Sequence, residues 1–373
     1  MLDSDNYNSV ASIKVIGVGG GGNNSIQTLL DKKIDGLEFI VANTDKQILD
    51  KFDKSLTLAL GDKRGIGAGA NPEVGKKAAE HSLQEIKERI KGANLVVITA
   101  GMGGGTGTGA SPIIAKAAKE QNSLVIAIVT TPFSFEGAKR KKIALEGIEE
   151  LKKHVDSYII LSNDKLLEAY GDSSINDAFR VSDNVVKQFI RTIVDIIAIP
   201  GRINLDLADL ETVIKNCGET LVGIGSANGE NAASKALKSA ISSPILESSI
   251  VGASNAILYF STSTKTTLND FNKAVSEFNQ IAGNDVNVIF GVTDIPNEES
   301  EKLGEVYVSV IATGIKRKPK NDFQPNIEGI ENSNSDATQE YLTIGASDRS
   351  NSYSKEDDYN SDDNELLFKT SRN

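Results

Sequence analysis

The sequence predicts an α/β protein in which a doubly wound parallel sheet is joined by a long central helix to a smaller α+β domain, with a disordered C-terminal tail. Three observations predict this architecture. Apolar, β-branched runs alternate with helical stretches from residue 13 onward. One later helical stretch is apolar around most of its circumference, and the composition becomes polar after residue 315. The length of 373 residues also exceeds the usual size of a single hydrophobic core.

Nearly continuous apolar runs are predicted to be buried parallel strands. They are Ile13–Val18, Leu37–Asn43, Leu95–Ala100 and Leu124–Thr130, with Tyr158–Leu161 as a fifth. Helical periodicity covers Ala78–Ile90 and Pro112–Glu120, and Asn71-Pro72 marks a further helix start. Ligands of such sheets bind beyond the carboxyl ends of the strands, so we expect binding residues in the segments that follow them.

Composition and charge exclude several classes of function. The formal net charge of −11 opposes binding to a nucleic-acid backbone. No apolar run approaches the roughly 18 residues of a membrane span, and residues 1–12 lack the features of a secretory signal, so we expect a cytoplasmic protein without direct membrane insertion. Cys217 is the only cysteine, and His81 and His154 are too isolated to suggest a zinc site.

A glycine-rich loop from Gly17 to Asn24 follows the first predicted strand and contains the spacing G-x-G-x-x-G. One interpretation is a tight strand-to-helix turn, and another is the dinucleotide site of an NAD-dependent dehydrogenase. The second gains support from Asn43-Thr44-Asp45, about 20 residues further on, where a ribose-binding carboxylate would be expected.

A second glycine-rich loop, Gly101 to Gly109, follows the strand Leu95–Ala100. Glycines let the backbone approach an anion, and Thr106 and Thr108 add hydroxyl donors. A dehydrogenase would explain the first loop but not the second. No lysine follows the glycines, so the P-loop pattern is absent. We therefore expect backbone dipoles and a Mg²⁺ ion, bound mainly through the phosphates and with no protein ligand assigned, to neutralise a nucleotide.

The run from Gly103 to Gly109 resembles the signature of the tubulin and FtsZ family, and the resemblance extends over about residues 12 to 315. Ala68–Glu73, Thr131–Gly137 and Asn163–Lys165 follow in the family's order. The resemblance implies a GTPase that assembles head-to-tail with itself into filaments of the bacterial division ring, at mid-cell. It implies a GTP-binding domain (12–180), a connecting helix (181–200), a catalytic loop and helix (201–217) and an α+β domain (218–315).

The same resemblance implies which residues bind the nucleotide, GTP or GDP. It assigns the phosphates to Gly20, Gly21, Gly22, Asn23 and Asn24 and to Gly105, Thr106 and Gly107, and the wider nucleotide-binding set adds Gly19, Gly103, Gly104 and Thr108. It assigns the ribose to Glu136 and Arg140 and the guanine to Asn163 and Asp183, with Phe179 stacked on the base. The Asp183 assignment is chemically sensible, because two carboxylate oxygens can accept from the two adjacent donors of guanine, whereas adenine presents an acceptor there. From the residues alone, Asp183 and Arg140 could also be solvated helix residues.

Val181–Ile199 is predicted to be a long helix buried between two bodies and ended by Pro200-Gly201. The loop Asn204-Leu205-Asp206-Leu207-Ala208-Asp209 then leads into another helix, and from the residues alone Asp206 is expected to cap it. The resemblance implies that Asn204, Asp206 and Asp209 reach the γ-phosphate of the next subunit and orient the attacking water there. The alternative is a GTP-binding structural polymer with little hydrolysis.

The remainder of the chain divides into a small α+β domain and a tail. Strands are expected near Ala256–Ser261, Val286–Thr293 and Val306–Ala312, and helices at Ala232–Ile241 and Leu268–Phe278. This domain lacks a titratable cluster and is expected to present a surface to the neighbouring subunit. Residues 316–362 have the composition of a disordered linker.

Residues 363–373 contain a short apolar and basic cluster, Leu366-Leu367-Phe368-Lys369. The resemblance places here a peptide that docks on membrane-tethering division proteins. The family's proline before the apolar pair is replaced by Asn364-Glu365, which leaves the partner open. A plain frayed terminus is the other interpretation.

Overall fold

The computed structural model describes residues 11–30, 37–62, 64–170, 174–243, 249–283, 285–294 and 304–315, which belong to one compact unit. The predicted linker (316–362) and terminal peptide (363–373) lie outside the described residues.

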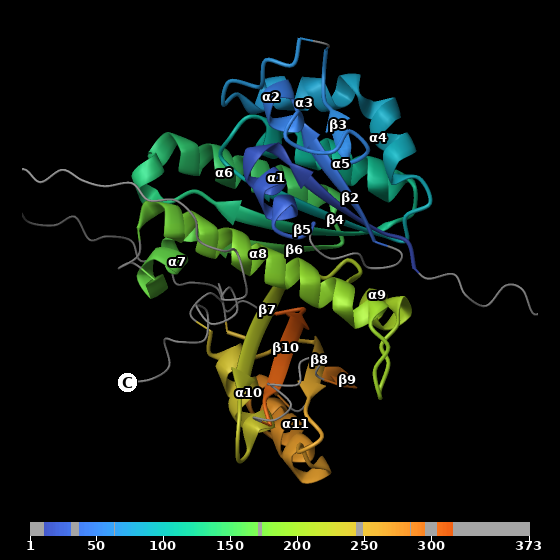
Figure 1. The fold of residues 1–373 in the computed structure, drawn as a ribbon, viewed down its shortest axis with the longest axis vertical. Coiled ribbons are helices and arrows are strands. Elements are labelled where there is room, and N and C mark those ends of the chain that lie inside the picture. Colours follow the sequence, from blue (N-terminus) through green and yellow to red (C-terminus); the bar gives the residue numbers. More distant parts are fainter. Residues whose placement is uncertain are drawn as a thin grey trace, which may run out of the picture. The chain divides into compact units, whose positions relative to one another are not determined.

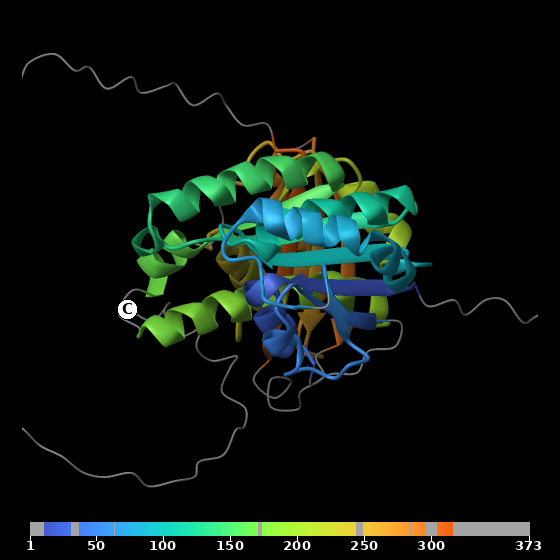
Figure 2. The ribbon, with the colours of Figure 1, turned by 90° about the horizontal axis from the view of Figure 1, so that it is seen from above.

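The first six strands form a parallel sheet in the order β3-β2-β1-β4-β5-β6, which is the doubly wound arrangement that the sequence predicts (Figure 1). They are β1 (Ile13–Val18), β2 (Leu37–Asn43), β3 (Thr57–Ala59), β4 (Leu95–Gly101), β5 (Leu124–Thr131) and β6 (Ser157–Ser162). Figure 2 shows the sheet between layers of helices, with α1 (Gly19–Gln27) and α8 (Ile175–Ala198) on one side of it. The parallel strands all end at one edge of the sheet, where the glycine loops begin.

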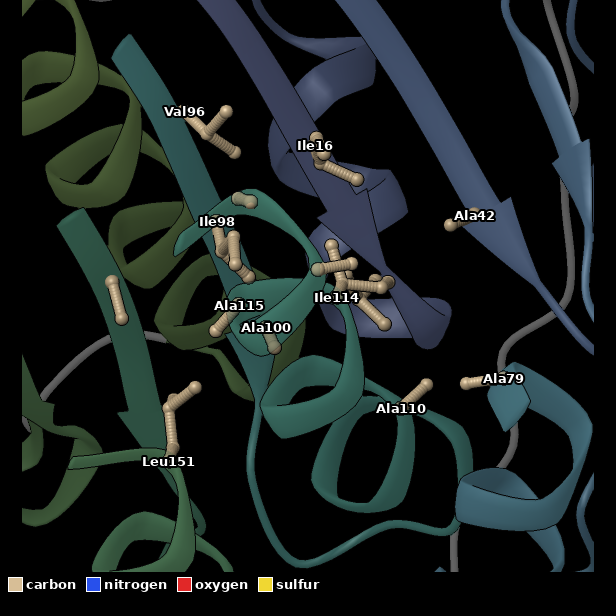
Figure 3. Close-up of a cluster of buried hydrophobic side chains, with 14 of the residues drawn as sticks. Ile16, Ala42, Ala79, Val96, Ile98, Ala100, Ala110, Ile114, Ala115 and Leu151 are labelled. Carbon is tan, nitrogen blue, oxygen red and sulfur yellow. The ribbon is translucent and has the colours of Figure 1, made fainter. Parts of the chain in front are cut away.

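The other face of this sheet is covered by α3 (Pro72–His81), α4 (Leu83–Ile90), α5 (Thr106–Glu120) and α6 (Ala138–Leu151), which share one hydrophobic core with the strands. Small residues allow close packing between α3 and α5, where Ala79 and Ala110 point toward one another (Figure 3). Short elements complete this half of the chain: α2 (Lys46–Leu49), the 3₁₀ turns η1 (Ser134–Glu136) and η2 (Lys152–His154), and α7 (Asn163–Tyr170).

Helix boundaries differ from the sequence prediction at three places, of which two lie before β5 and the third is the start of α8. The stretch Ala78–Ile90 is not one helix, because the chain breaks at Ser82, whose hydroxyl accepts from the Gly61 amide at 2.9 Å. Helix α5 begins at Thr106 and not near Pro112, which lies inside it. Proline removes one helical hydrogen bond, but the first turns of α5 are buried and their packing outweighs that loss. The N-terminus of α5 therefore lies directly on the second glycine loop.

Helix α8 confirms the predicted buried helix but starts earlier, at Ile175, where the Ser174 hydroxyl accepts from the Asp177 amide at 3.2 Å as an N-cap. Its wide apolar stripe is buried at Val185, Val186, Phe189, Ile190, Ile193, Val194 and Ile196, with Ile197 half-buried. Helix α9 (Leu207–Ile214) follows after a loop.

The second half of the described chain builds an α+β layer with its own core (Figure 1). It consists of β7 (Gly218–Ala227), α10 (Ala232–Ile241), β8 (Asn255–Thr262), α11 (Leu268–Ala282), β9 (Asn287–Asp294) and β10 (Val306–Thr313). Strand β10 pairs antiparallel with β7 and β8, and β9 pairs parallel with β8. Strand β7, which the sequence did not predict, also joins β6 through Ser157 and Tyr158, so the sheet order continues as β6-β7-β10-β8-β9.

Candidate nucleotide-binding site

The two glycine loops meet at the carboxyl ends of β1 and β4. Gly19 has a φ of +72°, and a Cβ added there would lie 2.7 Å from the Gly107 backbone nitrogen, so only glycine permits this approach. An added Cβ at Gly20 or Gly104 would meet no atom within 4 Å. The loops thus pack on each other along one side and leave backbone open on the other, as a phosphate cradle requires.

Two helices start in these loops, α1 at Gly19 and α5 at Thr106. Neither has a side-chain cap or an acidic residue in its first turn. Their first amides lack partners within the helix, and the helix dipoles place partial positive charge there. Two uncapped helix N-termini beside each other are typical of an anion site that has no lysine.

Two polar side chains that are predicted to bind the nucleotide also brace the loops through hydrogen bonds. Asn23 is fully buried, and its amide donates to the Gly17 oxygen at 2.7 Å and accepts from Asn43 at 2.6 Å. The Thr108 hydroxyl accepts from the Gly103 amide at 2.9 Å. These side chains fix the shape of the loops, which leaves the backbone of the loops to face an anion.

Glu136 and Arg140, the predicted ribose residues, are brought together by the structure. Glu136 Oε2 lies 2.8 Å from Arg140 Nη1, and Glu136 Oε1 accepts from the Phe133 amide at 2.9 Å. Gly103, at φ +99°, brings the second glycine loop against Arg140, since an added Cβ would lie 2.8 Å from the Arg140 oxygen. Arg140 therefore lies against the second glycine loop as well as on an exposed helix face.

The predicted guanine residues also converge. Phe179 and Asp183 are four residues apart on α8 and so share one face. Asn163 starts α7, is buried, and accepts from the Ser182 hydroxyl at 2.8 Å. Phe179 is 41% exposed and meets the Phe133 ring edge-on with the centroids 5.0 Å apart, which leaves area on Phe179 for a base.

Burial raises the pKa of Asp183 to about 6, and a hydrogen bond from the Ser25 hydroxyl at 3.3 Å opposes the rise. The ionised form of a carboxylate in this environment is stabilised by the hydrogen-bond donors that a ligand would bring. Ser25 was not singled out from the sequence, because its partner lies 158 residues away and only the fold brings α1 beside α8.

The predicted catalytic residues lie elsewhere. Helix α8 rises about 1.5 Å per residue, so its C-terminal end at Ala198 lies roughly 22 Å from Asp183. Figure 1 shows α7 and α9 at opposite ends of α8. Among the described residues, no hydrogen bond or ion pair joins Asn204, Asp206 or Asp209 to the glycine loops.

Asp206 and Asp209 form a capping box at the start of α9, which confirms the capping prediction. Asp206 Oδ1 accepts from the Asp209 amide at 2.9 Å, and Asp209 Oδ2 accepts from the Asp206 amide at 3.0 Å. Asn204 Oδ1 accepts from the Gly201 amide at 2.6 Å. Each of the two carboxylates uses one oxygen in the box, and the loop is held on β9 by the backbone bridge between Ile203 and Val292.

Within the described ranges, no group of three His, Cys, Asp or Glu side chains could hold a metal ion. Across the same part of the chain, no helix combines the length and apolarity needed to span a bilayer.

A parallel sheet in this strand order, with two glycine loops at its carboxyl edge, defines a nucleotide-binding protein of the doubly wound class. Residues 12–171 match the family model of the tubulin/FtsZ GTPase domain, and residues 218–316 match that of the FtsZ C-terminal domain. The chain is 54% identical over 330 residues to the cell division protein FtsZ of Mycoplasmopsis pulmonis, covering 88% of this chain and 83% of the relative. The chain therefore belongs to the FtsZ family, and its first domain is a GTPase domain that binds guanine nucleotide, which excludes the dehydrogenase alternative.

Solved structures agree with this assignment. An empty FtsZ dimer from M. jannaschii is 37% identical, with a TM-score of 0.76 over 82% of this chain and 88% of that chain. CetZ2 from Haloferax volcanii, solved as a protofilament with GTPγS, is 19% identical, with a TM-score of 0.69 over 83% of this chain and 94% of that chain. The second likeness shows the fold alone.

Proposed function

We propose that this protein is a self-assembling GTPase whose complete catalytic site forms between two copies stacked head-to-tail. One observation carries the proposal: the acidic loop Asn204–Asp209 follows the C-terminal end of α8, which lies roughly 22 Å from Asp183 of the predicted guanine site, so one copy would not bring the loop to its own nucleotide. Stacking would place the loop of one copy over the cradle of the next. The M. jannaschii FtsZ was solved as a dimer, which supports association of this kind.

In this mechanism the two ends of the chain have separate tasks. The uncapped amides of α1 and α5 would bind the phosphates and stabilise the charge that develops on them. Asp206 and Asp209 of the neighbouring copy would orient the attacking water. Each would use the carboxylate oxygen that makes no hydrogen bond within the capping box. Loss of the γ-phosphate removes part of the contact between copies, so hydrolysis would promote disassembly.

Mg²⁺ fits this cradle only as a companion of the nucleotide. The described side chains near the loops include the buried Thr106 hydroxyl, which shares a hydrogen bond of 2.6 Å with the Thr44 hydroxyl, and no carboxylate cluster. Mg²⁺ accepts oxygen ligands and keeps several waters, so it would be held through the phosphates. When bound, it would neutralise charge on the phosphates.

Family membership also supports a wider assignment. The Mycoplasmopsis relative is named a cell division protein, so we place this chain in the cytoplasm at the division site, as the subunit of the division filament. We retain the predicted domain limits, 12–180, 181–200, 201–217 and 218–315, and a terminal peptide that recruits membrane-tethering partners. Fusing residues 363–373 to a fluorescent protein and measuring its recruitment to division sites tests the peptide.

The decisive measurement combines light scattering with phosphate release over a range of protein concentrations, in GTP, GDP and ATP. We expect scattering and turnover only in GTP, with turnover per subunit rising as assembly begins. Turnover per subunit that is independent of concentration would contradict a site shared between copies. Assembly in GTP without phosphate release would favour the structural polymer.

The raised pKa of Asp183 predicts how guanine binding depends on pH. Only the ionised carboxylate accepts both guanine donors, and with a pKa of about 6 roughly a tenth of it is ionised at pH 5. We expect guanosine to bind about tenfold more weakly at pH 5 than at pH 7. Guanosine is used because it carries no phosphate that titrates in this range. The matched variant Asp183→Asn should bind weakly at both values, and an equally steep profile in that variant would show that another group is responsible.

A further inference from the structure

Asp164, the second residue of α7, lies where three elements of the nucleotide site meet. Its Oδ1 accepts from the Ser134 amide at 2.7 Å, and its Oδ2 accepts from the Ser134 hydroxyl at 2.7 Å. Lys141 Nζ of α6 lies 3.0 Å from Oδ2. One carboxylate thus joins α7, α6 and the turn η1, and Ser134 lies 30 residues away from it in the sequence.

The turn that Asp164 holds carries the predicted ribose residue Glu136 and packs against the predicted base residue Phe179 of α8. Phe133 is buried, stacks on Phe135 at 5.0 Å and meets Phe179 edge-on. Glu136 closes the same turn by accepting from the Phe133 amide. The contact between Asp164 and Ser134 therefore connects α7 to the turn that holds Phe133 and Glu136.

We propose that Asp164 is a positioning residue for the nucleoside, which fixes the turn Phe133–Gly137 against α7 without touching the ligand. The inference rests on the proposed nucleotide site. Glu136 is the other internal anchor of the turn, but its carboxylate is already divided between Phe133 and Arg140. A ribose hydroxyl that bonds Glu136 would compete with these contacts. Asp164 has no such competing task, so it would keep the turn in place while Glu136 changes partners.

The charge of Asp164 suits this task. Burial raises its pKa, but the hydrogen bonds from Ser134 and Lys141 outweigh burial, so the pKa lies below the usual value. The carboxylate is therefore ionised at neutral pH and accepts from all three donors. Charge-assisted hydrogen bonds are among the stronger ones in proteins, and Asp164 accepts two of them from a single serine.

The structure predicts an order of effects among variants of the full chain. Asp164→Ala removes all three contacts and should weaken guanosine binding about tenfold, because the turn must then be ordered by the ligand. Asp164→Asn can still bond both donor and acceptor groups of Ser134, and should stay within about threefold of the unmodified chain. Ser134→Ala loses one contact and should fall between them. Lys141→Ala should change little, since partly exposed ion pairs contribute little.

The measurement is displacement of a fluorescent guanine nucleotide by guanosine and, separately, by pyrophosphate. Guanosine should follow the order above, and pyrophosphate should bind every variant alike, because the phosphate cradle is built from other elements. Equal guanosine affinity in Asp164→Ala and the unmodified chain would overturn the inference. So would a parallel loss of pyrophosphate binding, which would indicate general loosening of the fold. If neither ligand displaces the nucleotide from the unmodified chain, the proposed site itself fails.

Discussion

Asp209→Ala is expected to bind GTP as the unmodified protein does and to lose GTP turnover by roughly a hundredfold or more. The reason is that the loop of Asp209 follows the C-terminal end of α8, roughly 22 Å along this helix from Asp183 of the predicted guanine site. Removing this carboxylate leaves the chain's own glycine loops intact. Nucleotide affinity measured on dilute, unassembled protein and phosphate release measured on assembled protein separate the two effects.

The capping box requires a matched control, because Asp209 also accepts from the Asp206 amide. Losing that contact removes one of the two hydrogen bonds of the capping box, which could itself disturb the loop. Asp209→Asn keeps an oxygen that can accept from the same amide and removes only the charge. If capping were the whole role, this variant would turn over GTP normally. We expect it to be as inactive as Asp209→Ala.

Mixing two inactive variants tests whether the carboxylate acts on the neighbouring copy. Asp209→Ala carries an intact nucleotide site, and Asp183→Ala, which should lose guanine binding, carries an intact acidic loop. In an equal mixture about a quarter of the contacts pair a working nucleotide site with a working loop, so up to that fraction of the turnover should return. A mixture as inactive as its components would argue that Asp209 acts within its own chain.

The sequence predicted the strands of the parallel sheet because burial on both faces leaves an almost unbroken apolar run, as in Ile13–Val18 and Leu95–Gly101. The same criterion missed β7, where Gly223 and Gly225 interrupt the apolar pattern. Their missing side chains admit the backbone of α10, since an added Cβ at Gly223 would lie 2.2 Å from the Ala240 oxygen. That reason exists only in the packed structure.

The candidate site likewise contains features that the sequence predicted and features that it did not. Its glycine loops could be predicted because a dense run of glycines has few explanations other than close backbone approach. The supporting contacts could not be predicted, because Ser25 with Asp183 and Ser134 with Asp164 are joined only by the fold. Capping of α9 by Asp206 was predictable from local sequence, since an N-cap and its partner lie within one turn.

Replacing single glycines of the first loop should distinguish those that are needed for stability from those that are needed only for nucleotide binding. Gly20 lies within α1 at a negative φ, and an added Cβ would meet no atom within 4 Å. Alanine favours helix over glycine by up to about 1 kcal/mol, so Gly20→Ala should unfold at an equal or higher temperature. The added methyl group nevertheless lies on the open face of the loop, where a phosphate must approach the amides. We expect guanine nucleotide affinity to fall by roughly 30- to 100-fold, the value of one or two charge-assisted hydrogen bonds.

Gly19→Ala provides the contrast, because its Cβ would lie 2.7 Å from the Gly107 nitrogen on a backbone at φ +72°. This variant should lose both thermal stability and nucleotide affinity, since the two loops can no longer pack on each other. Thermal unfolding without ligand, followed by GDP titration, distinguishes the two variants. A stable Gly20→Ala protein that still binds GDP normally would place the phosphates away from the start of α1. A stable protein that has lost GDP binding would mean that Gly20 is kept for the ligand, whereas Gly19 is also required by the packing of the fold.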